Sequence, residues 1–395
     1  MSSMCGIIDF EKSGVDFSTL REMGRAMILR GQDQSGAYLN GGIGLYHNRC
    51  IIGEPERARE PYTVSRNGKN YTVCFDGELK NCRGQNGDFD LLDFESAAQA
   101  VAESYLTLGA DLFSCLSGDY AFALCDEYRG EVLLARDPGG KKPLYYTFEE
   151  GVLRFASEIK GMLRAHEDLP AISTQKLTTH LLSPVGSCTA KDFYPGIREV
   201  APGECVVFSR VGMTGFRIVP PTYEEAQEEG VEPVLLRLQE ADDLAQELNE
   251  ILIAFDYPQF DAWMPGLLAE LRACRARQKR TLLFEDSTLC QSISYARERA
   301  DRLGMFYGVC AEGVAPAEHE SPEKRFRGLE QRLWELTESC DRKELRRLYG
   351  DGILAVVKRE KSTVKRIRML GILCQTLMWL ERYPLLLTTP ANEAG

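Results

Sequence analysis

The stretch Met4-Cys5-Gly6-Ile7-Ile8 opens the first apolar run of the chain and contains its most reactive side chain, the thiol of Cys5. A Cys directly behind a removable Met can become the first residue of a mature protein. Its own α-amine can then take the thiol proton, because an α-amino group titrates near neutral pH. Taken alone, a Cys at the start of a buried strand is more often a small structural hydrophobe. Cys5 is therefore a candidate nucleophile whose role depends on the rest of the sequence.

The residues ahead of Met4 affect this chemistry directly. In the sequence as written, the nitrogen of Cys5 lies in a peptide bond, and an amide cannot act as a base. We therefore expect that translation begins at Met4 and that this Met is removed, or that residues 1–4 are cleaved later.

The composition indicates a globular protein of two domains. The chain has 395 residues, of which 44% are hydrophobic and 27% charged, enough to bury a sizeable core. A net charge of −12 argues against nucleic-acid binding, because a polyanion would be repelled over most of the surface. The sequence contains neither an uncharged apolar stretch of about 18 residues nor a secretory signal pattern. We expect a cytoplasmic protein that acts on small molecules and enters no membrane.

The cysteines and histidines do not indicate a metal site. The 13 cysteines are scattered singly without a CxxC pair, so reduced thiols are expected. The four histidines are His47, His166, His180 and His319, and none stands at metal-ligand spacing from another or from a Cys. We interpret the histidines as ordinary surface or core residues and expect no bound metal.

Short apolar runs bounded by Gly, Pro, Asn and Asp fill the chain from Cys5 to Phe208. Runs such as CGIIDF (5–10), NYTVCFDG (70–77) and ECVVF (204–208) are typical of β-strands. Helical periodicity interrupts them at 18–29 and 95–108. This first part is predicted to be mixed α and β.

The pattern changes near Pro220 and Pro221, where we place the end of the first part. An acidic stretch at 223–232 follows. The remaining sequence is mostly helix-forming, with segments at 235–254, 263–276 and 324–338 and an apolar stripe at 369–380.

A series of motifs follows Cys5 in a fixed order. They are Arg30-Gly31-Gln32-Asp33-Gln34-Ser35-Gly36, Phe75-Asp76-Gly77-Glu78-Leu79-Lys80-Asn81, Leu134-Ala135-Arg136-Asp137, Lys142-Pro143-Leu144-Tyr145-Tyr146, Ala156-Ser157-Glu158-Ile159-Lys160, Tyr194-Pro195-Gly196-Ile197 and Pro202-Gly203-Glu204. In order and spacing these motifs resemble the glutaminase domain of the asparagine synthetases, which reads RGPDxSG, NGEIYN, LARDxxGxKPLYY and ASExK at these places. The resemblance identifies residues 5–210 as a class II glutamine amidotransferase domain, in which an N-terminal nucleophile releases ammonia from glutamine.

This resemblance implies an α+β fold. Residues 5–210 would form a four-layer αββα sandwich of the N-terminal nucleophile (Ntn) type, with the nucleophile at the end of a central strand. Residues 211–234 would be a linker and residues 386–395 a tail. Between them, residues 235–385 would form a smaller, mostly helical remnant of the family's ATP-pyrophosphatase domain, which is an α/β domain.

The same resemblance assigns roles to individual residues. Cys5 would attack the side-chain amide of glutamine. Arg49 aligns with the family arginine that pairs with the glutamine α-carboxylate, a task that suits a bidentate guanidinium. Glu78 would contact the substrate α-amino group, and Gly77 would supply a backbone N–H to the oxyanion hole.

Two positions depart from the family pattern. The family asparagine whose side-chain amide completes the oxyanion hole is Asp76 here, and an ionised carboxylate offers only acceptors beside a developing oxyanion. Loss of one such donor typically slows catalysis by about 10²–10³. The family aspartate that holds the α-ammonium is Ala97 here, although Asp93 or Glu95 could take its place after a helical shift.

The second half lacks the SGGxDS loop with which asparagine synthetases hold pyrophosphate. Three segments still resemble other parts of that domain, namely 255–261, 282–287 and the closing segment 366–383. We interpret the second half as an internally shortened relative. The family uses ATP and Mg²⁺, but no cofactor is evident for this chain.

These observations leave three hypotheses open. The first is an amidotransferase of the asparagine synthetase family that hydrolyses glutamine to glutamate and ammonia through a Cys thioester. The second is a glutaminase subunit that passes ammonia to a separate synthase. The third is a catalytically silent pseudoenzyme that binds glutamine or a partner. We expect weak glutaminase activity, no independent asparagine synthesis, and a homodimer as the family's usual assembly.

Overall fold

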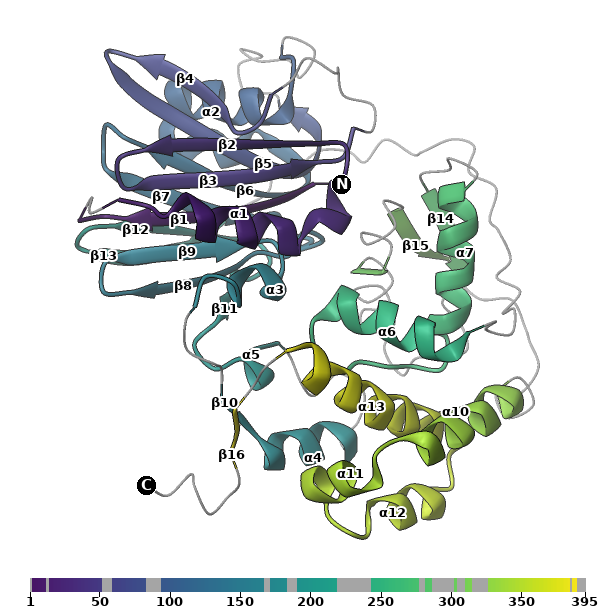
Figure 1. Ribbon diagram of the computed structural model, residues 1–395. Coiled ribbons are helices and arrows are strands. Elements are labelled where there is room, and N and C mark those ends of the chain that lie inside the picture. Colours follow the sequence, from purple (N-terminus) through teal and green to yellow (C-terminus); the bar gives the residue numbers. More distant parts are fainter. Residues whose placement is uncertain are drawn as a thin grey trace. The chain divides into compact units, whose positions relative to one another are not determined.

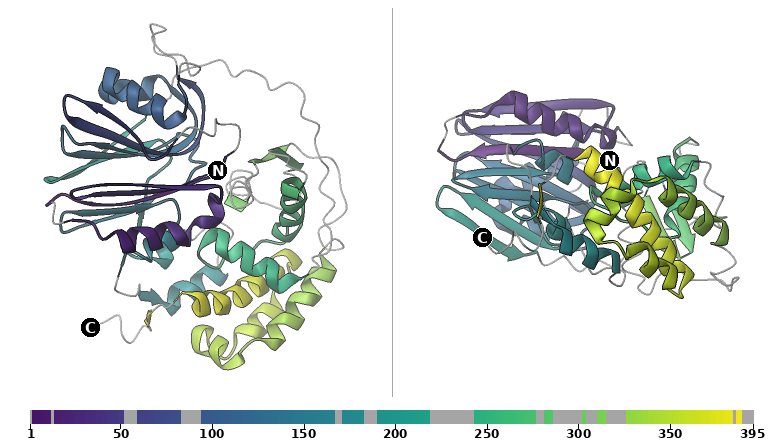
Figure 2. Two further views of the ribbon diagram at one scale, coloured as in Figure 1. Left: turned by 45° about the horizontal axis from the view of Figure 1, so that its top comes forward. Right: turned by 60° about the horizontal axis from the view of Figure 1, so that its bottom comes forward.

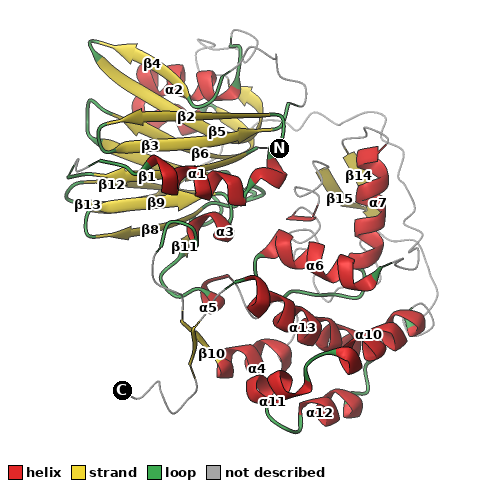
Figure 3. Cartoon of the chain, viewed as in Figure 1, coloured by secondary structure: helices red, strands yellow, loops and turns green. Residues whose placement is uncertain are grey.

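The computed structural model describes residues 2–11, 14–51, 59–82, 94–166, 171–182, 190–218, 243–276, 281–285, 302–303, 310–314, 326–383 and 386–388. The chain divides into two compact units (Figures 1 and 3). The first unit comprises Met1–Glu167 and Gly196–Gln227. The second comprises Asp168–Pro195 and Glu228–Gly395.

One sheet of the first unit contains the strand that begins the chain. Its strand order is β11-β8-β9-β1-β3-β2, and all its pairs are antiparallel. The strands are β1 (Ser3–Asp9), β2 (Gln34–Asn40), β3 (Ile43–Arg49), β8 (Tyr145–Glu149), β9 (Val152–Ala156) and β11 (Arg198–Glu199). Helices α1 (Phe17–Ala26) and α3 (Ile159–Met162) pack on this sheet.

The other sheet of the first unit has the order β13-β12-β7-β6-β5-β4 and is also antiparallel. Its strands are β4 (Tyr62–Arg66), β5 (Lys69–Cys82), β6 (Leu116–Asp126), β7 (Glu131–Arg136), β12 (Glu204–Ser209) and β13 (Gly212–Arg217). Helix α2 (Ala97–Leu108) packs on β4 and β5 and continues into the 3-10 turn η3 (Gly109–Ser114).

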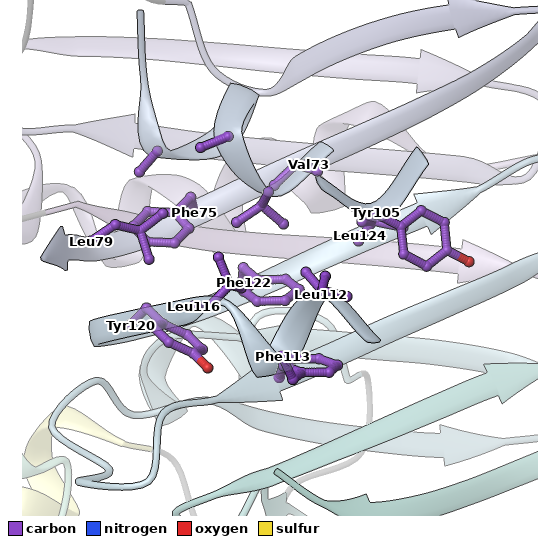
Figure 4. Close-up of a cluster of buried hydrophobic side chains, with 14 of the residues drawn as sticks. Val73, Phe75, Leu79, Tyr105, Leu112, Phe113, Leu116, Tyr120, Phe122 and Leu124 are labelled. Carbon is purple, nitrogen blue, oxygen red and sulfur yellow. The ribbon is translucent and has the colours of Figure 1, made fainter. Parts of the chain in front are cut away.

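The two sheets lie face to face, with α1 outside one and α2 outside the other (Figure 2). The core between the sheets contains Met4 and Ile8 from β1, Leu45 from β3 and Cys74 from β5. A separate core lies between the second sheet and α2 (Figure 4). The structure thus shows the predicted α+β class and the predicted αββα layers.

Local sequence explains why the two covering helices form. Asp16 caps α1 by accepting hydrogen bonds from the N–H groups of Ser18 and Thr19. Ser96 caps α2 by accepting from the N–H of Gln99 at 3.1 Å. Helix α2 turns four small alanines toward the sheet, which lets the helix approach closely and pack against Phe75 and Phe122.

The second unit is mostly helical in its described part. Its helices are α4 (Thr174–Leu182), α5 (Ala190–Phe193), α6 (Leu244–Phe255), α7 (Met264–Ala276), α10 (Arg327–Ser339), α11 (Arg342–Tyr349), α12 (Ile353–Arg359) and α13 (Thr363–Arg382). Two short parallel pairs accompany them, β10 (Ala171–Ser173) with β16 (Leu386–Thr388) and β14 (Thr281–Glu285) with β15 (Cys310–Val314). Within the described ranges, no helix combines the length and apolar character needed to cross a membrane.

A buried polar network joins two of the segments that resemble the synthetase domain. The indole N–H of Trp379 on α13 donates to the backbone oxygen of Asp256 at 3.0 Å, and the hydroxyl of Tyr383 donates to the Asp256 carboxylate at 2.9 Å. The Gln375 side chain accepts from the N–H of Gln259 at 2.8 Å. Each of these groups is buried, so a broken bond would leave a desolvated polar atom. The segments 255–261 and 366–383 therefore hold each other in place.

The two units differ from the predicted domain ranges in three places. Residues 168–195 were assigned to the first domain, yet they belong to the second unit, where the hydroxyl of Tyr194 bonds to the backbone oxygen of Asp256. Strand β13 falls in the predicted linker 211–234 and pairs with β12. Strand β16 falls in the predicted tail 386–395 and pairs with β10. Of the predicted segment 282–287, residues 286–287 lie outside the described part.

Candidate active site

Strand β1 turns alternate side chains to its two sides, as any strand does. On one side, the Ser3 hydroxyl donates to the backbone oxygen of Met27 at 3.3 Å, and the Cys5 thiol donates to that of Leu20 at 3.8 Å. Both acceptors belong to α1 and the turn after it, so this side faces the helical layer. Met4 faces the core between the sheets. Ser2 lies directly ahead of β1, and its backbone N–H donates to Asp76 on the other sheet at 3.1 Å.

Strand β3 presents two polar side chains to the space between the sheets. His47 is paired with Met4 across the β1–β3 ladder, and its Nε2 lies 2.9 Å from the backbone oxygen of Phe75 on the opposite sheet. Arg49 stands two residues further on the same strand and is also buried. The predicted ligand for the glutamine carboxylate therefore lies between the two sheets.

Asp76 on β5 faces the same space from the second sheet. Its side chain is fully buried, and it shares the side of Cys74, which packs in the inter-sheet core. One carboxylate oxygen accepts from Arg30 Nη2 at 2.5 Å, and the other accepts from the backbone N–H of Ser2 at 3.1 Å. We call the group formed by Ser2, Arg30, His47, Arg49 and Asp76 the inter-sheet site.

The first motif of the sequence explains how Arg30 reaches Asp76. Arg30 ends the 3-10 turn η1 (Ile28–Arg30), and a side chain on Gly31 would meet the backbone oxygen of Asn48 at 2.3 Å. Only glycine allows this close approach to β3. Asp33 then donates its N–H to the backbone oxygen of Arg49 at 3.1 Å and accepts from the N–H of Ile51 at 2.7 Å. The motif therefore wraps around the end of β3.

The Arg30–Asp76 pair bears on the predicted effect of the Asp76 departure. From the sequence, Asp76 in its ionised form was expected to offer only acceptors and to place negative charge beside a developing oxyanion. In the structure a buried guanidinium neutralises that charge, with both side chains at most 2% exposed. The carboxylate still has no proton to donate in its ionised form. Asp76 therefore faces the space between the sheets as half of an ion pair.

Gly77 adopts a backbone conformation that favours glycine. Its φ is +141°, and a Cβ there would meet the backbone oxygen of Asp119 at 2.1 Å. Tyr120, the residue opposite on β6, directs its own N–H and C=O to Asp137. The next residue, Glu78, is exposed and shares the side of Asp76, so its carboxylate lies at the rim of the site.

Ala97 offers no polar group to a ligand. Its methyl group is 8% exposed and packs in the core beneath α2. Glu95, one of the two alternatives, is exposed, and its N–H donates to the side chain of Gln99 at 2.8 Å. Asp93, the other alternative, lies outside the described residues. Among the predicted contacts to the substrate α-amino group, Glu78 is thus the one that the structure places on the face of Asp76.

The structure does not bring Cys5 together with Arg49 and Asp76. Cys5 directly follows Met4 on β1, and successive side chains of a strand point to opposite sides, so the Cys5 side chain points to the helical layer. Burial there raises the pKa of the Cys5 thiol, and a thiol that stays protonated is neither a nucleophile nor a metal ligand.

The residues ahead of Cys5 are an integral part of β1. Ser3 and Met4 are fully buried, and Met4 exchanges hydrogen bonds with Ser157, its N–H donating to the hydroxyl at 3.0 Å and its oxygen accepting from the Ser157 N–H at 2.9 Å. Removal of residues 1–4, as expected from the sequence, would take these contacts out of the sheet.

His47 belongs to the site although the sequence pointed only to an ordinary residue. It is 1% exposed, its Nε2 also lies 3.2 Å from the Glu60 carboxylate, and no partner for its Nδ1 is present among the described residues. Burial lowers the pKa of His47 to about 4. His47 is therefore neutral at pH 7. The sequence signal that could have identified His47 is its place in His47-Asn48-Arg49, two residues before the predicted ligand Arg49.

The buried neutral His47 should make the first unit sensitive to acid. Its pKa is about 4 when folded, against about 6.5 when unfolded, so the unfolded state binds the proton first as the pH falls. This contribution to stability is complete above pH 6.5 and should fall by about 3 kcal/mol between pH 6.5 and pH 4. Urea unfolding of His47→Gln should show a smaller loss between pH 7 and pH 4.5 than the wild type. The partly exposed His166, replaced by Gln, is the control, and equal pH dependence in all three proteins would contradict the prediction.

Comparison with known proteins identifies the class to which this site belongs. A family model described as a glutamine amidotransferase domain matches residues 1–218, so residues 1–4 fall inside the match. The fold and the match define a class II glutamine amidotransferase. The chain belongs to the asparagine synthetase family of these enzymes.

Two curated relatives and one solved structure give the extent of the likeness. Glutamine-hydrolysing asparagine synthetase 3 of Bacillus subtilis is 30% identical over 54% of this chain and 36% of its own. Asparagine synthetase B of Escherichia coli is 30% identical over 43% of this chain and 32% of its own. The chain thus matches these relatives over about a third of their length. Glutamine phosphoribosylpyrophosphate amidotransferase of Bacillus subtilis overlaps 82% of this chain and 70% of its own, at a TM-score of 0.40 and 16% identity.

Proposed function

We propose that the first unit binds glutamine and slowly hydrolyses its side-chain amide to glutamate and ammonia at the inter-sheet site. The observation that carries this proposal is the burial of Arg49, the Arg30–Asp76 pair and the start of β1 at one place between the sheets. A guanidinium in such a site suits an α-carboxylate, because it can donate two parallel hydrogen bonds away from competing water. Membership of the amidotransferase family supports glutamine as that ligand.

In the proposed reaction, three protein groups contact different parts of the glutamine substrate. Arg49 would hold the α-carboxylate, and Glu78 at the rim would contact the α-ammonium group. The N–H of Gly77 would stabilise the oxygen of the tetrahedral intermediate. Asp76 cannot add the second donor that an amide would supply, so turnover should be about 10²–10³ slower than with both donors.

A second candidate function is glutamine binding without turnover. Two observations favour it, namely the direction of the Cys5 side chain and the ion pair that fixes Asp76. A ligand that binds without reacting would make this protein a glutamine-responsive pseudoenzyme. Measured turnover decides between the two functions.

The second unit is proposed to be a shortened relative of the synthetase domain that does not form asparagine by itself. The sequence lacks the SGGxDS loop, and the described part of the chain offers no group of three His, Cys, Asp or Glu side chains that could hold a metal ion. The proposed hydrolysis of glutamine is written without ATP or Mg²⁺. Released ammonia would pass to a separate synthase. We also propose that the protein assembles as a homodimer.

Changing Arg49 tests the carboxylate contact. Arg49→Ala should weaken glutamine binding by about 10–100-fold, because a hydrogen-bonded charge pair contributes about 1.5–3 kcal/mol. Arg49→Lys keeps the charge but loses the bidentate geometry, so its affinity for glutamine should lie between those of the wild type and Arg49→Ala. Binding is measured by titration calorimetry with glutamine, and release of glutamate by a coupled assay.

Arg210→Ala is the matched control, since Arg210 pairs with Glu11 on the exposed surface of the same unit. This variant should bind glutamine like the wild type. Wild-type protein that fails to bind glutamine, or Arg49→Ala that binds it unchanged while folded, contradicts the proposed function.

A further inference from the structure

The backbone of Phe75 on β5 bonds to two side chains. Its N–H donates to Glu60 Oε2 at 2.9 Å, and its oxygen lies 2.9 Å from His47 Nε2. The ladder between β4 and β5 begins at the pair Tyr62–Val73, so Phe75 lies beyond it. Phe75, Glu60 and His47 are each at most 9% exposed, and buried backbone groups need such partners.

The two neighbours of His47 Nε2 determine where the ring carries its proton. Nε2 lies 2.9 Å from the Phe75 oxygen and 3.2 Å from Glu60 Oε2, and both of these oxygens are acceptors. The single ring proton of the neutral imidazole therefore belongs on Nε2. We call the contacts of His47 and Glu60 with the Phe75 backbone the Phe75 clamp.

The glycine at the end of the first motif allows Glu60 to enter the clamp. Gly36 on β2 pairs with His47 across the ladder to β3, and a Cβ on Gly36 would overlap with the backbone oxygen of Glu60. Only glycine leaves room for the Glu60 backbone at this point of β2. The motif at 30–36 thus keeps Glu60 beside His47, where its carboxylate reaches the N–H of Phe75.

The clamp ties the strand of Arg49 to the strand of Asp76 and Gly77. His47 stands two residues before Arg49 on β3, and Phe75 directly precedes Asp76 on β5. In the proposed reaction Arg49 holds the α-carboxylate of glutamine and Gly77 the oxygen of its side-chain amide, so the separation of the two strands must match the substrate. A misplacement of about 1 Å can slow a reaction about 10²-fold.

We propose that His47 and Glu60 are positioning residues for glutamine turnover, because they fix the Phe75 backbone and with it the distance between the two strands that contact the substrate. This inference rests on the proposed hydrolysis and adds side chains that act on it without touching glutamine. Loss of either contact should lower kcat. Binding of the α-carboxylate should persist, since β1 and β2 hold the strand of Arg49 from both sides.

Paired substitutions in the full-length chain test the inference. His47→Leu and Glu60→Leu each remove one contact and should lower kcat by about 10–100-fold. The Kd for glutamine, measured by titration calorimetry, should stay within about threefold of the wild type. Glu60→Gln keeps an oxygen acceptor and His47→Gln keeps an N–H donor, so each should recover most of the turnover that the matching Leu variant loses.

Glu127→Leu is the control for a general loss of stability. Glu127 follows β6 and accepts hydrogen bonds from Tyr38 at 2.6 Å and Asn40 at 2.7 Å on β2, so its carboxylate also joins the two sheets. It lies past the end of the β5–β6 ladder, away from the middle of the ladder where Phe75 is paired. This variant should unfold at lower urea concentration and keep its kcat.

Hydrogen exchange adds a readout that does not depend on turnover. The Phe75 amide should exchange slowly in the wild type and in Glu60→Gln, and about 10-fold faster or more in Glu60→Leu, where its acceptor is gone. Mass spectrometry with residue-level fragmentation assigns the exchange to Phe75. An equal exchange rate in the wild type and Glu60→Leu overturns the inference.

The outcomes separate this inference from the proposed function. Wild-type protein that binds no glutamine, or binds it without turnover, refutes the proposed hydrolysis, and the inference falls with it. A kcat that the Leu variants of the clamp lower no more than Glu127→Leu does, or a loss confined to glutamine affinity, overturns the inference and leaves the function standing. A loss of kcat at unchanged Kd that the Gln variants recover supports it. His47→Asn, whose shorter polar side chain does not reach Phe75, replaces a Leu variant that fails to fold and should show the same loss of kcat.

Discussion

Replacing Arg30 with Met is expected to lower the free energy of unfolding of the first unit by about 3–5 kcal/mol, the usual result of removing one partner from a buried ion pair. Asp76 is fully buried, and Arg30 is its charged partner at 2.5 Å. Without that guanidinium, the carboxylate would have to be buried alone. Urea unfolding of the full chain gives the loss, and hydrogen exchange of β1 and β5 amides assigns it to the first unit.

A double-mutant cycle separates the pair from its parts. Arg30→Met combined with Asp76→Asn removes both charges, so it should be more stable than Arg30→Met alone. Arg25→Met is the control, because Arg25 pairs with Glu22 on the exposed side of α1 at 2.9 Å, and exposed pairs contribute about 0–1 kcal/mol. Equal losses in Arg30→Met and Arg25→Met would show that the buried pair does not carry this stability.

The second large effect is expected at Gly77. Gly77→Ala should cost about 3–5 kcal/mol, because its φ of +141° is strained for an L side chain and the added Cβ would lie 2.1 Å from the backbone oxygen of Asp119. β5 and β6 would have to move apart where Asp76 stands. Glutamine turnover should therefore be lost together with stability.

Gly68→Ala distinguishes the clash from the backbone strain. Gly68 has a φ of +72° in the turn between β4 and β5, and a Cβ there would meet no described atom within 4 Å. This variant should lose only about 1–2 kcal/mol, the ordinary cost of a left-handed conformation. If Gly77→Ala is no more destabilised than Gly68→Ala, close approach of the strands does not constrain this position.

The sequence predicted much of the first unit because its strands are short runs bounded by turn residues. The runs at 5–10, 70–77 and 204–208 lie in β1, β5 and β12. The helices predicted at 18–29 and 95–108 correspond to α1 and α2, although α1 ends at Ala26 and a 3-10 turn follows. The motif at 30–36, which carries part of the family resemblance, contacts Arg49 in the structure, since the N–H of Asp33 donates to the backbone oxygen of Arg49.

Two features of the site could not be predicted from local sequence. The Arg30–Asp76 pair joins the 3-10 turn η1 to β5 across 46 positions of sequence, and a local periodic pattern cannot predict such a contact. The direction of Cys5 depends on which residue of β1 faces the second sheet, and a shift of one position reverses every side chain. A reactive residue type drew attention to Cys5, whereas in the structure its thiol faces the helical layer.

The path of the chain between the two units has a consequence for how the protein can be divided. The chain leaves the first unit after Glu167, contributes residues 168–195 to the second, and returns at Gly196. A fragment ending at residue 218 would therefore carry Phe193 and Tyr194, both at most 1% exposed here, without the Trp379 and Asp256 that cover them. Deleting the second unit would therefore expose apolar side chains that are buried here, and an exposed apolar patch favours aggregation.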